Sequence, residues 1–262
     1  MITSSSNSRI KNVMQLTSKA KARKEQHSFV VEGIKMFLEA PIERIKEVYV
    51  SDTLLKRILL EKGSLFERLQ QIEYEVVTDD VFVKMSDTKT PQGILCVVEQ
   101  FSYTLPEVLA EANGLWLVLE DIQDPGNLGT ILRTGEGAGI HGVVMTRGTV
   151  DIYNPKTIRS TMGSLYRMPF FYTEELSEVI ALLQKEQIKV YAAHLKGEQF
   201  YHEIDYQDGA AFLIGNEGNG LRKETADLAD CYLKIPMEGK LESLNASIAA
   251  ALLMYQASNG RR

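Results

Sequence analysis

The chain has 262 residues, of which 44% are hydrophobic and 24% are charged, as in ordinary globular proteins with a hydrophobic core. This composition excludes collagen, a disulfide-rich miniature scaffold and a largely disordered chain. The net charge of −6 excludes a uniformly basic nucleic-acid-binding protein, and no apolar run approaches the roughly 20 residues that a membrane-spanning helix needs.

The N-terminal sequence and the cysteines indicate a cytoplasmic protein. MITSSSNSRIKN lacks the apolar core of a secretory signal. Cys96 and Cys231 lack metal-ligand spacing, and we expect both to be reduced and buried. We therefore expect neither a membrane partner nor a metal centre.

Residues 1–100 are expected to form a smaller α/β domain, because short β-branched runs alternate there with helical patterns. The predicted helices span 9–25, 34–40, 53–71 and 79–85, and the predicted strands span 29–33, 47–51, 73–77 and 93–99. Residues 101–114 contain a proline and end in Asn-Gly, which indicates a linker with a short helix.

Residues 115–262 alternate strands and helices in a pattern typical of an open, mostly parallel sheet covered by helices on both faces. The predicted strands span 115–122, 142–146, 168–172, 189–195, 210–215 and 231–237. The predicted helices span 127–138, 154–164, 174–186, 220–228 and 243–257. The fold class expected from the pattern is therefore α/β, with two domains.

The first 24 residues are basic and contain no acidic side chain. Such a segment on an acidic protein is compatible with contact to an RNA backbone, and the alternative is a solvated helical segment without a partner. The candidate RNA contacts are four clustered residues: Lys19, Lys21, Arg23 and Lys24.

Gly137 to Gly142 spells GxGxxG, the fingerprint of a dinucleotide site. The fingerprint requires a strand before it and a helix after it, whereas here a helix precedes and a strand follows. We therefore interpret these glycines as the end of a helix, which argues against a nicotinamide or flavin site.

Three loops with glycine and polar residues follow predicted strands of the second half: 124–129, 215–220 and 235–245. Because the carboxyl ends of parallel strands share one edge of a sheet, the loops can converge on a ligand, although each could also be an ordinary turn. Arg133 follows the first loop in an apolar, glycine-rich helix and suits a phosphate or sugar. Motifs of metalloproteases and serine hydrolases are absent. The residues alone thus predict a metal-free, glycine-lined site with four polar members: Asn127, Arg133, Glu217 and Asn245.

These loops resemble, in order, the three motifs of the SpoU/TrmH family of SPOUT methyltransferases. The matching segments are NLGTILRTGEGAG at 127–139, FLIGNEGNGL at 212–221 and IPMEGKLESLNASIAAALL at 235–253. NPKTIRSTMGSLYRMPF, at 154–170, fits the stretch between the first two motifs. Three weaker motifs resemble the family's N-terminal substrate-binding domain: SSNSRIKNVMQL, FVVEGIKMFLEA and KTPQGILCVVE.

The resemblance implies 2′-O-methylation of ribose in RNA with S-adenosylmethionine (AdoMet) as the cofactor. It also implies a trefoil knot, an exception to the rule that chains are unknotted, and a homodimer whose partner subunit helps to form the site. The N-terminal domain favours ribosomal RNA, 23S rRNA above all. The alternatives are the same chemistry on tRNA, an RNA-binding protein of this fold without catalysis, and a dehydrogenase.

The resemblance assigns AdoMet contacts, made chiefly through the main chain, to four residues: Gly215, Ile235, Met237 and Leu244. It makes Arg133 the central catalytic residue, and it assigns the positioning of the ribose or of Arg133 to four others: Asn127, Glu217, Ser243 and Asn245. A guanidinium is effectively always charged. We therefore expect Arg133 to bind the adjacent phosphate and to stabilise charge on the 2′-oxygen, while the proton leaves to solvent or to another acceptor.

Overall fold

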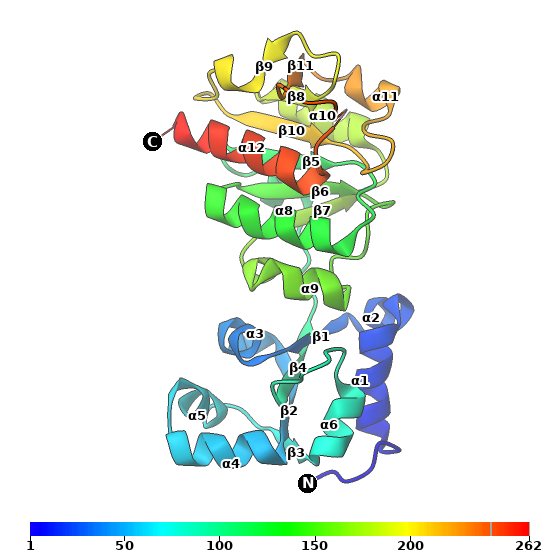
Figure 1. The fold of residues 1–262 in the computed structure, drawn as a ribbon, viewed down its shortest axis with the longest axis vertical. Coiled ribbons are helices and arrows are strands. Elements are labelled where there is room, and N and C mark those ends of the chain that lie inside the picture. Colours follow the sequence, from blue (N-terminus) through cyan, green and yellow to red (C-terminus); the bar gives the residue numbers. More distant parts are fainter. Residues whose placement is uncertain (242, 262) are drawn as a thin grey trace. The chain divides into compact units, whose positions relative to one another are not determined.

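The computed structural model describes residues 1–241 and 243–261, which form two compact units (Figure 1). The first unit contains residues 1–101 and 153–166, and the second contains residues 102–152 and the chain from Arg167 onward. Nothing in the strand and helix pattern indicated that residues 153–166 join the first unit.

The first unit contains a four-stranded mixed sheet in the order β1–β4–β2–β3. β4 runs antiparallel to β1 and β2, whereas β2 and β3 are parallel. Its strands are β1 (Ser28–Glu32), β2 (Ile45–Ser51), β3 (Glu75–Val77) and β4 (Ile94–Glu99). Its helices are α1 (Ser8–Ser18), α2 (Ala20–Gln26), α3 (Ile34–Glu39), α4 (Asp52–Glu61), α5 (Ser64–Leu69), α6 (Asp79–Met85) and α9 (Pro155–Thr161).

Two helices that the sequence pattern predicted as continuous are interrupted, so these two predictions are wrong. The range 9–25 splits into α1 and α2 because Lys19 has an extended backbone, with φ −123°. The range 53–71 splits into α4 and α5 because Lys62 adopts a left-handed conformation, with φ +47°, and Gly63 follows it.

The second unit contains a parallel seven-stranded sheet in the order β7–β6–β5–β10–β8–β11–β9, which confirms the mostly parallel α/β sheet. Its strands are β5 (Leu115–Leu119), β6 (Gly142–Thr146), β7 (Phe170–Thr173), β8 (Lys189–Ala193), β9 (Gln199–Phe200), β10 (Ala210–Ile214) and β11 (Cys231–Lys234). The two-residue β9 is too short to show in a sequence pattern.

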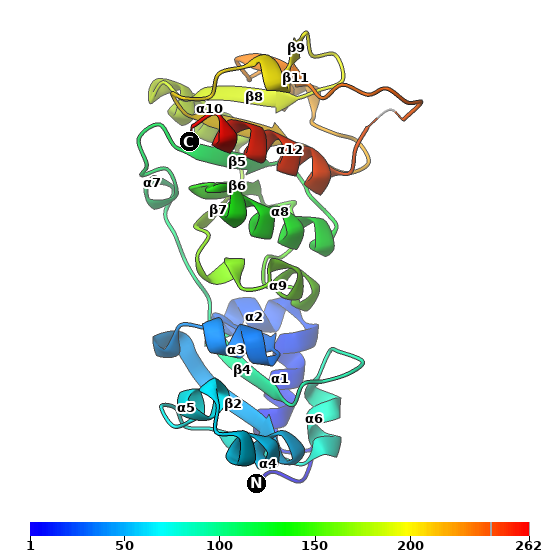
Figure 2. The same ribbon diagram turned by 60° about the vertical axis from the view of Figure 1, so that its left-hand side comes forward.

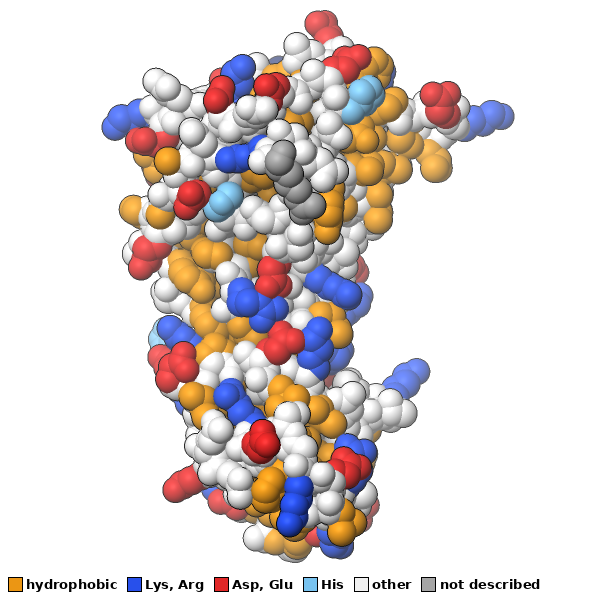
Figure 3. Space-filling view, turned by 90° about the vertical axis from the view of Figure 1, so that its left-hand side faces the viewer, with side chains coloured by type: hydrophobic (Ala, Val, Ile, Leu, Met, Phe, Trp, Pro, Cys, Tyr) orange, Lys and Arg blue, Asp and Glu red, His pale blue; other side chains and the backbone are white. Residues whose placement is uncertain are grey.

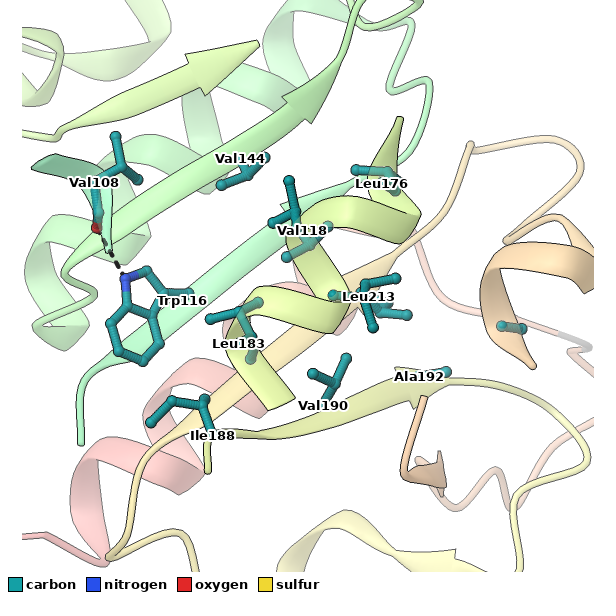
Figure 4. Packing of buried hydrophobic residues seen from close by; sticks show 14 residues of the cluster. Val108, Trp116, Val118, Val144, Leu176, Leu183, Ile188, Val190, Ala192 and Leu213 are labelled. Carbon is teal, nitrogen blue, oxygen red and sulfur yellow. Dashed lines mark hydrogen bonds between the residues drawn. The ribbon is translucent and has the colours of Figure 1, made fainter. Parts of the chain in front are cut away.

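Helices cover both faces of this sheet. They are α7 (Leu105–Val108), α8 (Pro125–Ala138), α10 (Leu176–Lys185), α11 (Lys223–Ala226) and α12 (Ala246–Asn259). α8 and α12 lie side by side on one face (Figures 1 and 2). On the other face α10 packs on apolar side chains of the strands, and Trp116 donates a hydrogen bond to the carbonyl of Val108 in α7 (Figure 4).

Gly139 and the two cysteines test smaller expectations. Gly139 has φ +76° and ends α8, which confirms the interpretation of these glycines as a helix end. Cys96 is buried, and burial raises the pKa of its thiol to about 12, so it stays a protonated thiol. Cys231 is only half-buried, because it lies in β11 near the edge of the sheet.

The strand order reverses between β5 and β10. The chain continues from β5 to β6 and β7 on one side, whereas β10 and β8 occupy the other. Open parallel sheets bind ligands at the carboxyl ends of strands beside such a reversal. The fold therefore directs attention to the loops that follow β5, β10 and β11.

Candidate active site

The loop that follows β10 is folded around Asn216. Its side-chain oxygen accepts a hydrogen bond from the N–H of Gly218 at 2.9 Å, and its amide donates to the carbonyl of Asp121 at 2.7 Å. Asp121 lies just after β5. Asn216 therefore both shapes its own loop and joins it to the loop after β5.

Gly215 allows this loop to close on itself. A Cβ atom at Gly215 would lie 2.1 Å from the carbonyl carbon of Gly220 and 2.1 Å from the nitrogen of Leu221. Backbone atoms cannot yield to a side chain as flexible side chains do. Only glycine fits here, which explains why a glycine-rich loop follows this strand.

Glu217 joins the second loop to the first. One carboxylate oxygen accepts hydrogen bonds from the N–H of Asp124 at 3.0 Å and from the amide of Asn127 at 2.9 Å. The other oxygen accepts from the N–H of Gln123 at 3.0 Å. Partial burial by itself would raise the pKa of Glu217, but these hydrogen bonds outweigh it and hold the pKa below its ordinary value. Glu217 is therefore an ionised acceptor at neutral pH.

Asn127 and Asn245 extend this connection to α12. Asn245 donates its amide to the side-chain oxygen of Asn127 at 3.0 Å. The oxygen of Asn245 caps α12 by accepting from the N–H of Ser247 at 2.8 Å. The polar relay formed by Glu217, Asn127 and Asn245 thus fastens together segments that lie about 90 and 118 residues apart in sequence.

Glu120 is a structural residue of this region that sequence reasoning missed. It is buried directly after β5, and its carboxylate accepts hydrogen bonds from the backbone N–H of Arg222 at 2.7 Å and from Nε of Arg222 at 2.8 Å. The hydroxyl of Thr225 also donates to it. The signal was available, since an acid at the end of an apolar strand requires partners when it is buried.

The loops that follow β8, β10 and β11 border a cavity of about 710 Å³, within the range of sites for cofactors and other small molecules. Among its described lining residues none comes from the loop after β5. All four residues expected to contact AdoMet line the cavity, together with two of the expected positioning residues: Gly215, Ile235, Met237, Leu244, Glu217 and Ser243. His194 and Lys196, which follow β8, also line the cavity and were not predicted. The polar relay connects Asn127 and Asn245 to Glu217, which lines the cavity.

The chemistry of the lining fits AdoMet. Among the described residues, its lining includes half-buried apolar side chains such as Met237 and Leu244, one carboxylate, Glu217, and two lysines, Lys196 and Lys234. The backbone N–H groups of Met237 and Leu244 have no hydrogen-bond partner among residues 1–241 and 243–261, so both can donate to a ligand. Apolar walls and backbone donors suit the adenosine group of AdoMet, and the Glu217 carboxylate suits its cationic sulfonium.

Arg133 does not line this cavity. It is exposed, and within the described chain no hydrogen bond or ion pair holds its guanidinium. The buried residues of α8, such as Ile131, Leu132 and Gly135, face the sheet or α12. At 100° per residue Arg133 lies on the opposite side of the helix from the centre of that buried face.

The four basic residues of the N-terminal segment differ in environment. Lys19, Lys21 and Lys24 are exposed, whereas Arg23 is buried. Arg23 donates to the carbonyls of Leu16 at 2.9 Å and Thr17 at 3.3 Å, so it satisfies the C-terminal end of α1. Basic and acidic side chains are interspersed on the face drawn in Figure 3, without a uniformly basic area.

Comparisons with known proteins agree with this geometry. Residues 114–255 match the SpoU rRNA Methylase family, and residues 7–96 match the MRM3-like substrate binding domain. The chain belongs to the SpoU rRNA methylase family. Among the residues that the structure describes, no helix is long and apolar enough to cross a membrane, and no group of three or more potential ligands could hold a metal ion.

Individual relatives share both units of the chain. The 23S rRNA (guanosine(2553)-2′-O)-methyltransferase RlmP of Bacillus subtilis is 34% identical over 97% of each chain. The 23S rRNA (guanosine-2′-O-)-methyltransferase RlmB of Bordetella pertussis is 29% identical over 84% of this chain and 91% of its own. The SpoU methyltransferase AviRb of Streptomyces viridochromogenes, solved in complex with AdoMet, superimposes with a TM-score of 0.84 at 25% identity over 97% of each chain.

Proposed function

We propose that this SpoU methyltransferase transfers the methyl group of AdoMet to a ribose 2′-oxygen in 23S rRNA. The observation that carries the proposal is the convergence of the loops after β8, β10 and β11 on one cavity, which the polar relay joins to the loop after β5. The similarity to RlmP extends over 97% of the chain, so it includes the substrate-binding unit as well as the catalytic one. This favours an rRNA over a tRNA substrate.

The residues of the cavity hold and orient the cofactor. AdoMet supplies an electrophilic methyl group, and an in-line displacement by an oxygen requires alignment above all. The main chain at Gly215, Ile235 and Leu244 would bind the cofactor, and Met237 would cover it. Glu217, Asn127 and Asn245 keep the loops in register, while Ser243, exposed at the rim, would contact the ribose.

Arg133 is the proposed catalytic residue. It would bind the phosphate beside the reacting ribose and stabilise the negative charge that develops on the 2′-oxygen. The oxygen–carbon bond would form as the bond between the methyl carbon and sulfur breaks. Since a guanidinium does not accept a proton at neutral pH, the 2′-hydroxyl proton would leave to solvent or to another acceptor. The guanidinium of Arg133 has no partner among residues 1–241 and 243–261, and this supports the role, because none of these residues has to be displaced.

The position of Arg133 leads us to propose a homodimer in which it acts on the cavity of the partner subunit. α12 carries apolar side chains on its outer face, where Ile248 is 50% exposed and Tyr255 is 43% exposed. Gly137, on the outer part of α8, lies beside Tyr255. A helix that is apolar on all sides needs a second partner, and a second copy of this surface would provide one.

The proposal also includes the trefoil knot and a cytoplasmic location. α12 follows β11 in sequence but packs against α8 and β10, so residues 235–245 pass across the carboxyl ends of neighbouring strands. Such a passage is what a knotted connection requires. The cytoplasm is where an enzyme that modifies rRNA would meet its substrate.

The proposal is tested by incubating the purified protein with methyl-tritiated AdoMet and total RNA. We expect label in 23S rRNA, at a ribose that resists alkaline hydrolysis. Label confined to tRNA would show that the substrate is tRNA and not 23S rRNA. RNA binding without label would identify a binding protein that has lost catalysis.

A further inference from the structure

A second cavity lies in the first unit, and the proposed reaction does not use it. Its volume is about 620 Å³. It is bordered by Ile34 at the start of α3, by residues 91–93 before β4, and by residues of α4 and α6. Two motifs that the sequence analysis singled out, FVVEGIKMFLEA and KTPQGILCVVE, thus meet at one place.

Gly33 and Gln92 fix one border of this cavity. Gln92 accepts a hydrogen bond from the N–H of Ile34 through its side-chain oxygen at 2.7 Å. Gly33 has φ +107°, and a Cβ atom there would lie only 3.1 Å from that oxygen. The amide nitrogen of Gln92 has no partner among the residues that the structure describes, so it can donate to a ligand.

Glu32 fixes the loop that leads to Gln92. Its carboxylate accepts hydrogen bonds from the hydroxyls of Ser86 at 2.6 Å and Thr88 at 2.7 Å, and from the N–H of Asp87 at 3.2 Å. The loop is therefore fastened at its base, while Lys89 further along it is exposed.

The walls of the cavity combine apolar surface with polar groups. Phe82, Val83 and Pro91 supply apolar wall, and Val83 is 61% exposed although it lines a hollow. Asp79 accepts a hydrogen bond from the hydroxyl of Thr53 at 2.7 Å, which lowers its pKa and keeps it ionised. The guanidinium of Arg57 lies 3.9 Å from Glu61, at the limit of an ion pair, and is about half exposed.

This combination matches an unpaired RNA base better than a helix or a peptide. A base splayed out of a single strand offers two flat faces for apolar walls and a polar edge for hydrogen bonds. A carboxylate accepts from ring and exocyclic N–H groups, whereas a guanidinium or an amide donates to ring nitrogens and carbonyls. Lys84 on α6 and Lys89 are exposed beside the cavity and carry the positive charge that flanking phosphates need.

We propose that the cavity of the first unit binds one unstacked base of the substrate RNA, at a position other than the methylated nucleotide. This inference rests on the proposed function, since it takes RNA as the substrate. The match of residues 7–96 to a substrate-binding domain supports it, because the cavity lies wholly within that range. The cavity thereby selects the RNA, while the cavity of the second unit carries out the reaction.

The test compares two variants of the full-length protein that add the same charge. Val83→Asp introduces an acid into the cavity wall, whereas Leu60→Asp introduces one at a position on α4 that is 85% exposed and does not line the cavity. We expect Val83→Asp to lower kcat/KM for 23S rRNA about tenfold or more, as loss of a stacked base does, with unchanged AdoMet affinity in calorimetry. Leu60→Asp should behave as wild type, and thermal melting checks that both variants fold.

A second measurement locates the base directly. Substrate rRNA that contains 6-thioguanosine and 4-thiouridine is irradiated with the wild-type protein, and the cross-linked peptides are identified by mass spectrometry. We expect cross-links to the segments that line the cavity, which are residue 34 and residues 51–57 and 79–93. Equal kcat/KM for the two Asp variants, or cross-links in the first unit only outside these segments, would overturn the inference. Wild-type protein that methylates no RNA at all would instead overturn the proposed function.

Discussion

The two cavities of this protein are built in different ways. In the second unit, the loops that border the cavity converge because β10, β8 and β11 are neighbouring parallel strands whose carboxyl ends share one edge of the sheet. In the first unit the sheet is mixed, and the cavity depends on individual contacts such as those of Gln92 with Ile34 and Glu32 with Ser86. A parallel sheet thus fixes the place of a site through topology, whereas a mixed sheet leaves that place to single side chains.

We expect the largest effect from a substitution of Arg133, which lines neither cavity. Arg133→Ala should lower kcat for methyl transfer about 100- to 1000-fold, as removal of one oxyanion donor does. The affinity for AdoMet should stay unchanged, because Arg133 does not line the cavity. Single-turnover kinetics and calorimetry measure the two quantities, and a large loss of AdoMet affinity would contradict the assignment.

Mixed dimers separate action within a subunit from action across the interface. In the proposed homodimer, co-expressed Arg133→Ala and Gly215→Ala chains would form mixed dimers that contain one intact cavity opposite one intact Arg133. The assay uses an AdoMet concentration too low to fill the Gly215→Ala cavity. If Arg133 serves the partner, the mixture should recover up to about a quarter of wild-type activity, as random pairing of two subunits predicts. If the mixture stays inactive, Arg133 acts on the cavity of its own chain.

Gly215→Ala tests whether the glycine loop shapes the cavity. Its methyl group would meet backbone atoms of Gly220 and Leu221 at 2.1 Å, so the loop must move. We expect AdoMet affinity to fall about tenfold or more, as displaced polar contacts would cause. Gly63→Ala is a control, because a Cβ atom there meets nothing within 4 Å and Gly63 does not line the cavity. If calorimetry gives Gly215→Ala and its control equal affinities for AdoMet, the close approach of backbone atoms to Gly215 does not affect cofactor binding.

Of the four candidate RNA contacts in the basic segment, only the three exposed lysines should matter for RNA binding. Changing Lys19, Lys21 and Lys24 together to Ala should reduce the slope of log affinity against log salt by up to about 2, at roughly 0.7 for each phosphate contact with single-stranded RNA. Arg23→Ala should instead lower the free energy of unfolding, since Arg23 holds carbonyls at the end of α1. An unchanged salt slope for the triple variant would leave this segment a solvated helix.

The smallest effect concerns the pH dependence of the polar relay. Glu217→Gln places an amide N–H₂ against N–H donors and should lower the free energy of unfolding by about 1 kcal/mol at pH 7. Because the folded protein lowers the pKa of Glu217, its stabilisation is complete above the ordinary Glu pKa of about 4.3 and is lost as the pH falls through the lowered value. Urea unfolding should therefore show the two proteins converging in stability below about pH 4. A difference that stays constant down to pH 3 would contradict this role.

The sequence predicted the architecture of the second unit and the convergence of its loops, because alternating strands and helices restrict the topology. It could not predict that Glu217 accepts a hydrogen bond from Asn127, since such a contact depends on how two loops distant in sequence meet in the fold. Nor could it separate Arg23 from Lys24: both are basic residues in one segment, yet one is buried under α1 and the other is exposed. The helix breaks at Lys19 and Lys62 depend on the backbone conformation of one residue each, and the residue type lysine does not indicate that conformation.

Hydrogen–deuterium exchange with and without AdoMet tests the central claim most directly. If the loops of the second unit enclose the cofactor, backbone amides at 215–220 and 235–245 should exchange more slowly when AdoMet is present, and the first unit should be unaffected. Protection confined to other segments, or no protection at saturating AdoMet, would contradict the claim that these loops form the cofactor site.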